Sequence, residues 1–145
     1  MNATSLPAEP RKQVFLKPPR YVLLSDKQRI GPTVTDNRQT AHSTVIYGFS
    51  DAPIYKEFMA NSGVPLMPYP LVKTYLREQL SDLDGETEAV KLVVIDAVSP
   101  VEPSINAVTM QAVLSAFEEQ STQMAATHGL EFVDATNAYR LHPNS

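Results

Sequence analysis

Polar side chains able to bind a ligand or to move a proton stand near the ends of three apolar segments. Ser50 follows the first segment, Asp96 lies in the second, and Asp134 follows the third. In open α/β sheets, ligands bind outside the carboxyl ends of the strands, so these three side chains could converge on one sheet edge. A purely structural alternative exists, because Asp and Ser are common where strands turn into loops and bond to the local backbone there.

A serine becomes a nucleophile when a neighbouring base takes its proton, and His142 near the end of the chain carries an imidazole that could do so. The candidate catalytic residues are therefore Ser50, Asp96, Asp134 and His142. The chain has no cysteine, which excludes cysteine nucleophiles and thiolate metal sites. Its histidines are scattered, and its glycines form neither a GxGxxG motif nor a P-loop. We expect no metal and no cofactor.

The charge of the chain is divided unevenly along its length. Residues 1–40 hold seven Lys or Arg against three acids, a charge of +4, whereas residues 41–145 hold five against thirteen, a charge of −8. Residues 1–40 also carry five of the twelve prolines, which favours an extended segment. We interpret them as a basic arm that docks on its own domain, on a protein partner or on a second copy. The residues expected to make this contact are Arg11, Lys12, Lys17, Arg20 and Tyr21.

Residues 41–145 predict a single domain of alternating strands and helices. The expected elements, in chain order, are a strand at 44–47, helices after Pro53 and from Pro70, a strand at 90–98, a long helix from Ser104 to His128, and a strand at 130–133. This βααβαβ order indicates an α/β fold with a small, mainly parallel sheet and helices on both faces. The remaining segments are an edge strand at 21–24 in the arm, a rigid loop at 64–70, and a tail at 140–145.

The sequence lacks the signals that direct a protein into a membrane. The first residues contain no apolar run typical of a signal peptide, and no stretch approaches the roughly eighteen apolar residues of a membrane span. We therefore expect a cytoplasmic protein without a membrane partner. A nucleic-acid partner is not expected either, because the acidic domain would repel a phosphate backbone.

Two short segments resemble parts of the SGNH-type esterases. Residues 132–134 followed by 141–144 are similar to the end of those enzymes, in which the histidine is the general base. Ser50 follows the first strand, as their serine does, although the glycine-aspartate-serine order is not kept. The resemblance implies ester hydrolysis with Ser50 as the nucleophile and His142 as the base. Tyr139 stands where their aspartate would be.

Two further resemblances point to regulation. Residues 92–100, with the sequence LVVIDAVSP, resemble the phosphoacceptor strand of receiver domains, with Asp96 as the acceptor and Pro100 four residues later. Residues 92–134 are similar in pattern to the middle of STAS domains, with Ser104 at the start of a helix. Either resemblance implies a module that is switched at Asp96 or Ser104.

Two features favour a non-catalytic interaction or assembly subunit over an enzyme. No complete catalytic set is present in the sequence, and the arm and the domain carry opposite charges. The leading hypothesis is therefore a subunit whose basic arm docks on a protein partner or on a second copy in a homo-oligomer. The alternatives are a small SGNH-like serine hydrolase and a STAS-like or receiver-like regulatory module.

Overall fold

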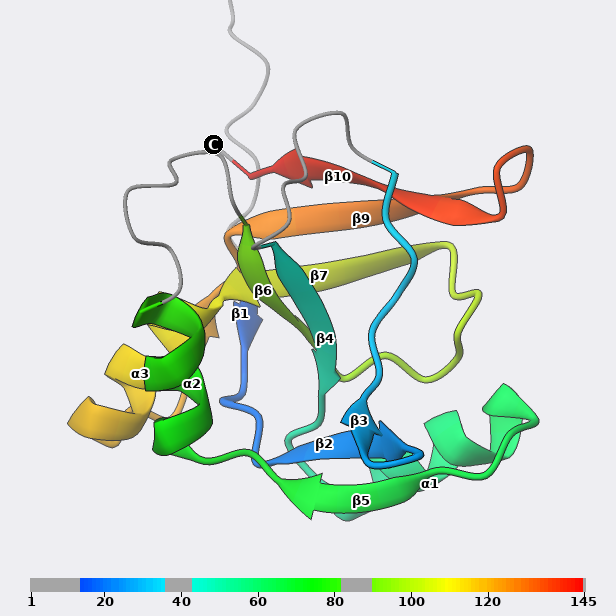
Figure 1. The fold of residues 1–145 in the computed structure, drawn as a ribbon. Coiled ribbons are helices and arrows are strands. Elements are labelled where there is room, and N and C mark those ends of the chain that lie inside the picture. Colours follow the sequence, from blue (N-terminus) through cyan, green and yellow to red (C-terminus); the bar gives the residue numbers. More distant parts are fainter. Residues whose placement is uncertain (1–13, 36–42, 82–89, 145) are drawn as a thin grey trace, which may run out of the picture.

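The computed structural model describes residues 14–35, 43–81 and 90–144, and sheet predominates over helix in them. Strands hold 39% of these residues and helices 26%. The main sheet is curled and has five strands in the order β10-β9-β7-β6-β4 (Figure 1). Its members are β4 (Thr44–Gly48), β6 (Lys91–Ile95), β7 (Ser104–Thr109), β9 (His128–Val133) and β10 (Ala138–Pro143).

The predicted helix-rich, mainly parallel α/β fold is wrong. Within the described part of the chain, β4 and β6 form the one parallel pair, and the other neighbours in the main sheet are antiparallel. The strands predicted near residues 44–47, 90–98 and 130–133 are nevertheless present as β4, β6 and β9. The error therefore concerns the elements placed between these strands, which decide how the strands are connected.

The long helix predicted from Ser104 is instead a strand followed by a shorter helix. Residues 104–109 form β7, which pairs with β6 on one side and β9 on the other. Helix α3 (Met110–Glu119) begins only after Thr109, whose Oγ1 accepts a hydrogen bond from the Ala112 N–H at 3.1 Å. The true N-cap is thus Thr109, and Gln120 ends the helix in the left-handed region at φ 56°.

The predicted tail is also wrong, because the chain returns after β9 to form another strand. Residues 134–137 make a tight turn in which Asn137 takes a left-handed conformation at φ 53°. Strand β10 then pairs with β9 in antiparallel register from Ala138 to Pro143. This hairpin covers the side of β9 that faces away from β7 and closes one end of the main sheet.

The described part of the arm forms strands that pair with strands from the rest of the chain. Strand β1 (Phe15–Leu16) pairs with β8 (Met124–Ala125). Strand β2 (Tyr21–Ser25) lies between β3 (Gln28–Arg29) and β5 (Met67–Pro70), so it is the central strand of a second sheet and not an edge. Residues 67–70 were expected in a rigid loop, yet they pair with β2 along its length.

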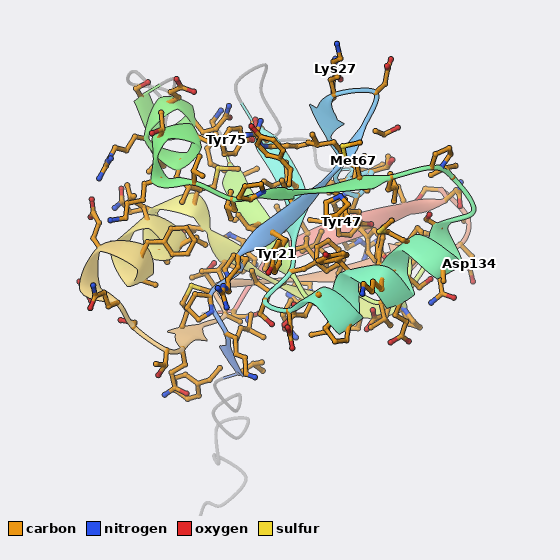
Figure 2. The ribbon with its side chains drawn as sticks, turned by 90° about the horizontal axis from the view of Figure 1, so that it is seen from below. Tyr21, Lys27, Tyr47, Met67, Tyr75 and Asp134 are labelled. Atoms are coloured by element: carbon orange, nitrogen blue, oxygen red, sulfur yellow. The ribbon has the colours of Figure 1, made fainter. Side chains whose placement is uncertain are left out.

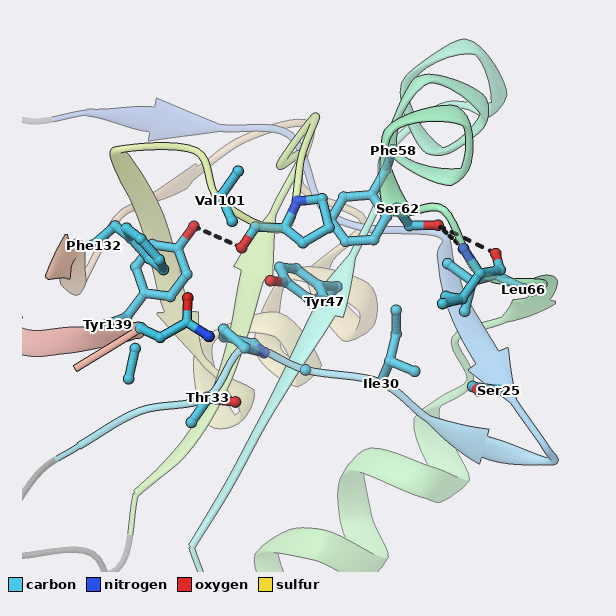
Figure 3. Close-up of a pocket in the computed structure, with 16 residues that line it drawn as sticks. Ser25, Ile30, Thr33, Tyr47, Phe58, Ser62, Leu66, Val101, Phe132 and Tyr139 are labelled. Carbon is cyan, nitrogen blue, oxygen red and sulfur yellow. Dashed lines mark hydrogen bonds between the residues drawn. The ribbon is translucent and has the colours of Figure 1, made fainter. Parts of the chain in front are cut away.

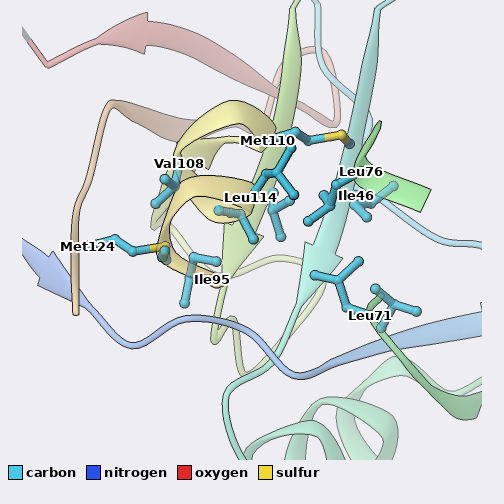
Figure 4. Close-up of a cluster of buried hydrophobic side chains, with 12 residues drawn as sticks. Ile46, Leu71, Leu76, Ile95, Val108, Met110, Leu114 and Met124 are labelled. Carbon is cyan, nitrogen blue, oxygen red and sulfur yellow. The ribbon is translucent and has the colours of Figure 1, made fainter. Parts of the chain in front are cut away.

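Two apolar clusters lie on opposite faces of the main sheet, because neighbouring residues of a strand point to opposite sides. Val93 belongs to the cluster packed beneath α3 and α2 (Lys73–Ser81), which Figure 4 shows. Val94 belongs to the other cluster, together with Phe58 of α1 (Ala52–Ser62). Gly63 ends α1 in the left-handed region, with φ 73°. None of the described helices is long and apolar enough to cross a membrane.

Candidate functional site

Ser50 and Asp96 meet at the carboxyl ends of the two parallel strands. β4 and β6 end side by side, and the chain turns sharply at Asp96, which takes a left-handed conformation at φ 59°. The Asp96 carboxylate accepts two hydrogen bonds of 2.7 Å from Ser50, one from its backbone N–H and one from its hydroxyl. The Asp96 N–H in turn donates to the carbonyl of Gly48 at 2.9 Å. The sequence prediction that these side chains converge is realised for this pair.

Ser50 forms part of the wall of a cavity of about 730 Å³, which we call the cationic groove. The groove lies between the described part of the arm, the start of α1, the start of α2 and the end of α3. Three cationic side chains line it, namely Lys17, Arg20 and Lys73. The rest of its wall consists of Pro18, Ser50, Asp51, Ala116, Phe117, Gln120, Ser121 and Thr122.

The three cations of the groove make no ion pair with the described part of the chain. The ion pairs found there join Arg77 to Glu118 at 3.1 Å and His142 to Glu131 at 3.9 Å. Lys17, Arg20 and Lys73 are exposed, and Asp51, a carboxylate in the same wall, brings one negative charge and caps α1 by accepting from the Ala52 N–H at 2.9 Å. Positive charge therefore exceeds negative charge in the groove, and the excess is available to a ligand.

The arm residues predicted to contact a partner have different positions. Arg11 and Lys12 lie outside the described residues. Lys17 and Arg20 line the cationic groove. Tyr21 is half-buried, and its ring, labelled near the middle of Figure 2, meets the Tyr55 ring edge-on at a centroid distance of 5.1 Å. Of the predicted contact residues that the structure describes, the two basic ones, Lys17 and Arg20, thus face the groove.

His142 and Asp134 do not join Ser50. β9 runs in the same direction as β4, and His142 pairs with Gly129 near the start of β9. His142 therefore lies at the sheet edge opposite Ser50. Asp134 follows the end of β9, is exposed, and lies at the periphery of the molecule in Figure 2. The structure thus does not assemble a serine–histidine pair from the predicted residues.

Outside the groove, burial shifts the pKa values of several groups from their ordinary values. Burial raises the pKa of Tyr139 to about 12 and raises the pKa of Tyr47 further, each with the help of negative charge at Glu102. Burial also lowers the pKa of His128, and the neighbouring His142 adds to this effect.

Among residues 14–35, 43–81 and 90–144, no three carboxylate or imidazole side chains gather closely enough to hold a metal ion.

The sequence analysis missed Lys73 and the residues at the end of α3. Lys73 belongs to the helix that the sequence predicts from Pro70 and is exposed in the structure, but a helix prediction does not show which segment lies opposite it. Residues 116–122 were expected inside the long helix, whereas α3 ends at Glu119 and exposes Gln120 to Thr122 to the groove. Only the packing of α2 against α3 brings these segments beside the arm, and no local sequence signal encodes that contact.

Comparisons of the chain with protein-family models, with curated proteins and with solved structures found no match. The function is therefore argued from the residues of the chain itself.

Proposed function

We propose that the protein is a non-catalytic binding protein that takes a small phosphate-bearing molecule in the cationic groove. The observation that carries the proposal is the meeting in one cavity of three cations, from the arm and from α2, that form no ion pair with the described residues. Arg20 supplies a planar fork that matches two phosphate oxygens, and Lys17 and Lys73 supply mobile point charges. A phosphate monoester carries a charge of about −1.5 to −2 at neutral pH and offers three acceptor oxygens.

The local excess of positive charge in the groove is consistent with the overall negative charge of the chain. Asp51 in the wall and Asp96 behind Ser50 reduce the positive charge of the groove but do not cancel three cations. A small anion in the groove senses these neighbours most strongly, because salt screens charges more than about 8–10 Å away. An extended polyanion would also meet the acidic surface, which favours a small ligand over a nucleic acid.

The size and the walls of the groove also support a small molecule. A volume of about 730 Å³ falls within the range of roughly 300–1,000 Å³ that is common for small-molecule sites. Phe117, Ala116 and Pro18 form an apolar part of the wall, against which a ring or chain of the ligand can pack. The Asp51 carboxylate and the hydroxyls of Ser121 and Thr122 can bond to hydroxyl groups of the same ligand.

Ser50 is better explained as a structural residue of the groove than as a nucleophile. Its hydroxyl donates to Asp96, and the described wall of the groove contains no histidine to take a proton. Both of its hydrogen bonds to Asp96 fix the end of β4 against the end of β6. We therefore assign Ser50 the role of fixing the groove wall that the phosphate contacts.

The experiment titrates the full chain with phenyl phosphate and measures the heat of binding by isothermal titration calorimetry. We expect binding that weakens as salt is added, and weaker binding of benzoate, which has one charge and two oxygens. Arg20→Ala and Lys73→Ala should each weaken the binding of phenyl phosphate by roughly 3- to 10-fold, because each removes a charge-assisted bond at a solvent-exposed site. The matched control is Lys56→Ala, which removes an exposed lysine of α1 outside the groove. Equal effects of Lys56→Ala and Lys73→Ala, or no binding at all, would contradict the proposal.

The assembly hypothesis makes a different use of the same cations. Lys17 and Arg20 would then bind acidic side chains of a protein partner or of a second copy, and a phosphate would compete with them. Light scattering of the full chain, with and without phenyl phosphate, separates the two functions. A monomer under both conditions supports the small-molecule function, whereas an oligomer that phenyl phosphate dissociates supports assembly.

A further inference from the structure

A second cavity, of about 330 Å³, lies on the face of the main sheet opposite α2 and α3 (Figure 3). Four aromatic rings belong to its wall. Tyr47 and Phe58 form one pair, with ring centroids 4.6 Å apart, and Phe132 and Tyr139 form another, with centroids 5.2 Å apart. It shares no lining residue with the cationic groove, and none of the described residues that line it is charged.

The mouth of this aromatic cavity is apolar and open, while its wall is buried. Val64 and Val101 line the cavity, and their exposed fractions are 54% and 57%. By contrast, Phe58 and Tyr139 are 1% and 2% exposed. Exposed apolar side chains around a concave site indicate a place where an apolar ligand enters.

The two phenol hydroxyls of the cavity differ in their partners. The Tyr139 hydroxyl donates to the Glu102 carbonyl at 2.7 Å and lies 3.3 Å from the Pro100 carbonyl. The Tyr47 hydroxyl makes no hydrogen bond to another residue of the described chain, although Tyr47 is only 3% exposed. Figure 3 shows the Tyr47 ring among the lining residues, with its oxygen on the side of Tyr139.

The Tyr47 hydroxyl is not among the fully buried atoms of the described residues that lack a partner, so water can reach it, and the carbonyl oxygen of a ligand can take the place of that water. The Tyr47 phenol is protonated at neutral pH, as tyrosines ordinarily are, and burial raises its pKa further. Tyr47 is therefore a hydrogen-bond donor in the wall of an uncharged cavity, whose lining combines the four rings with neutral polar side chains such as Thr33 and Asn137. A charged ligand would lose its hydration there without gaining a counterion.

We propose that the aromatic cavity binds a neutral, planar aromatic molecule whose carbonyl oxygen accepts a hydrogen bond from Tyr47. The four rings offer edge-to-face and offset contacts to such a molecule. This site is independent of the phosphate site, since the two cavities lie on opposite faces of the sheet and differ in charge.

The test uses acetophenone as the probe and follows the ring signals of Phe58 and Phe132 by NMR in the full chain. Isopropylbenzene keeps the ring and a branched substituent of similar size but has no acceptor, and benzoate adds a charge. We expect acetophenone to shift both signals and to bind more tightly than either comparison compound. Tyr47→Phe keeps the ring and removes the hydroxyl, so it should weaken acetophenone by roughly 3- to 10-fold and leave isopropylbenzene unchanged.

The matched control is Tyr69→Phe, which removes a hydroxyl from a tyrosine outside this cavity that is 46% exposed. It should leave the binding of acetophenone unchanged. The proposal is overturned if acetophenone leaves the signals of Phe58 and Phe132 unmoved, or if it binds wild type and Tyr47→Phe equally well. It is also overturned if benzoate binds as tightly as acetophenone.

Discussion

Residues 14–35 should contribute to the stability of the whole domain, and Leu23→Ala tests this directly. Leu23 in β2 is 0% exposed and belongs to the cluster that includes Phe49 and Phe58. Replacing a buried leucine by alanine costs about 2–5 kcal/mol, because apolar contacts are lost and a cavity remains. The total stability of a domain is about 5–15 kcal/mol, so this one substitution should remove a large share of it.

Urea unfolding followed by far-UV circular dichroism measures the loss. The control is Phe15→Ala in β1, where the side chain is 54% exposed and the expected loss is below about 1 kcal/mol. A chain that begins at Ala41 lacks β1, β2 and β3 and should fail to fold, since it loses both Leu23 and the fully buried Val22. The reasoning is refuted if Leu23→Ala and Phe15→Ala lose the same stability, or if the chain from Ala41 unfolds cooperatively at the wild-type urea concentration.

Three other predictions follow from single contacts. Asp96→Ala should lower the free energy of unfolding by roughly 2–4 kcal/mol, because it removes both bonds to Ser50 and leaves at φ 59° a residue without the short polar side chain that favours the left-handed region. Asp96→Asn should cost less in the same urea assay, since asparagine tolerates this conformation. In an alkaline absorbance titration, Tyr139→Phe should remove a phenol that ionises near pH 12, and it should cost about 1–3 kcal/mol by leaving the Glu102 carbonyl without its donor. The free energy of unfolding should fall as the pH falls below about 6.5. The folded state lowers the pKa of His128 and therefore binds fewer protons than the unfolded state. In urea unfolding at pH 8 and pH 5, His128→Gln should reduce the difference between the two free energies, and an unchanged difference would contradict the assignment.

The elements predicted correctly from the sequence are those with unambiguous local signals. The run Leu92–Ile95 is apolar and rich in β-branched residues, which favours a strand in any context. Helix α1 has Pro53 in its first turn and Gly63 at its end, and both residues have conformational preferences that suit those positions. In each case one local rule was sufficient, and the rest of the fold did not oppose it.

Strand β7 was missed because its residues satisfy two local rules at once. Ser104 after Pro103 looks like the start of a helix, and Ile105 and Val108 are spaced three residues apart, as on a helix face. The same segment also fits a strand buried on both faces, as Ala107 and Val108 are in the structure. The choice is made by tertiary pairing, since the edge of β6 away from β4 is covered by residues 107–109.

The sequence predicted only the part of the site that depends on the direction of neighbouring strands. Ser50 and Asp96 follow parallel neighbouring strands, so their meeting follows from the position of each strand end. The expectation failed for His142 because it assumed a tail, whereas the hairpin of β9 and β10 returns that residue to the opposite edge. Lys73 joins the groove through the packing of one helix on another, and such contacts between distant segments leave no periodic signal in the sequence.

Both proposed sites contain residues of the arm, the basic segment 1–40 that the charge pattern of the sequence distinguished. Lys17 and Arg20 line the cationic groove, and Ile30 and Thr33, from the same segment, line the aromatic cavity. The segment can reach both faces because Tyr21 pairs with Phe49 through two backbone hydrogen bonds, of 2.8 and 3.0 Å, just beyond the end of β4. Because a chain without residues 1–40 is not expected to fold, a point substitution is the better test of the two sites. Arg20→Ala should weaken the binding of phenyl phosphate and leave the binding of acetophenone unchanged.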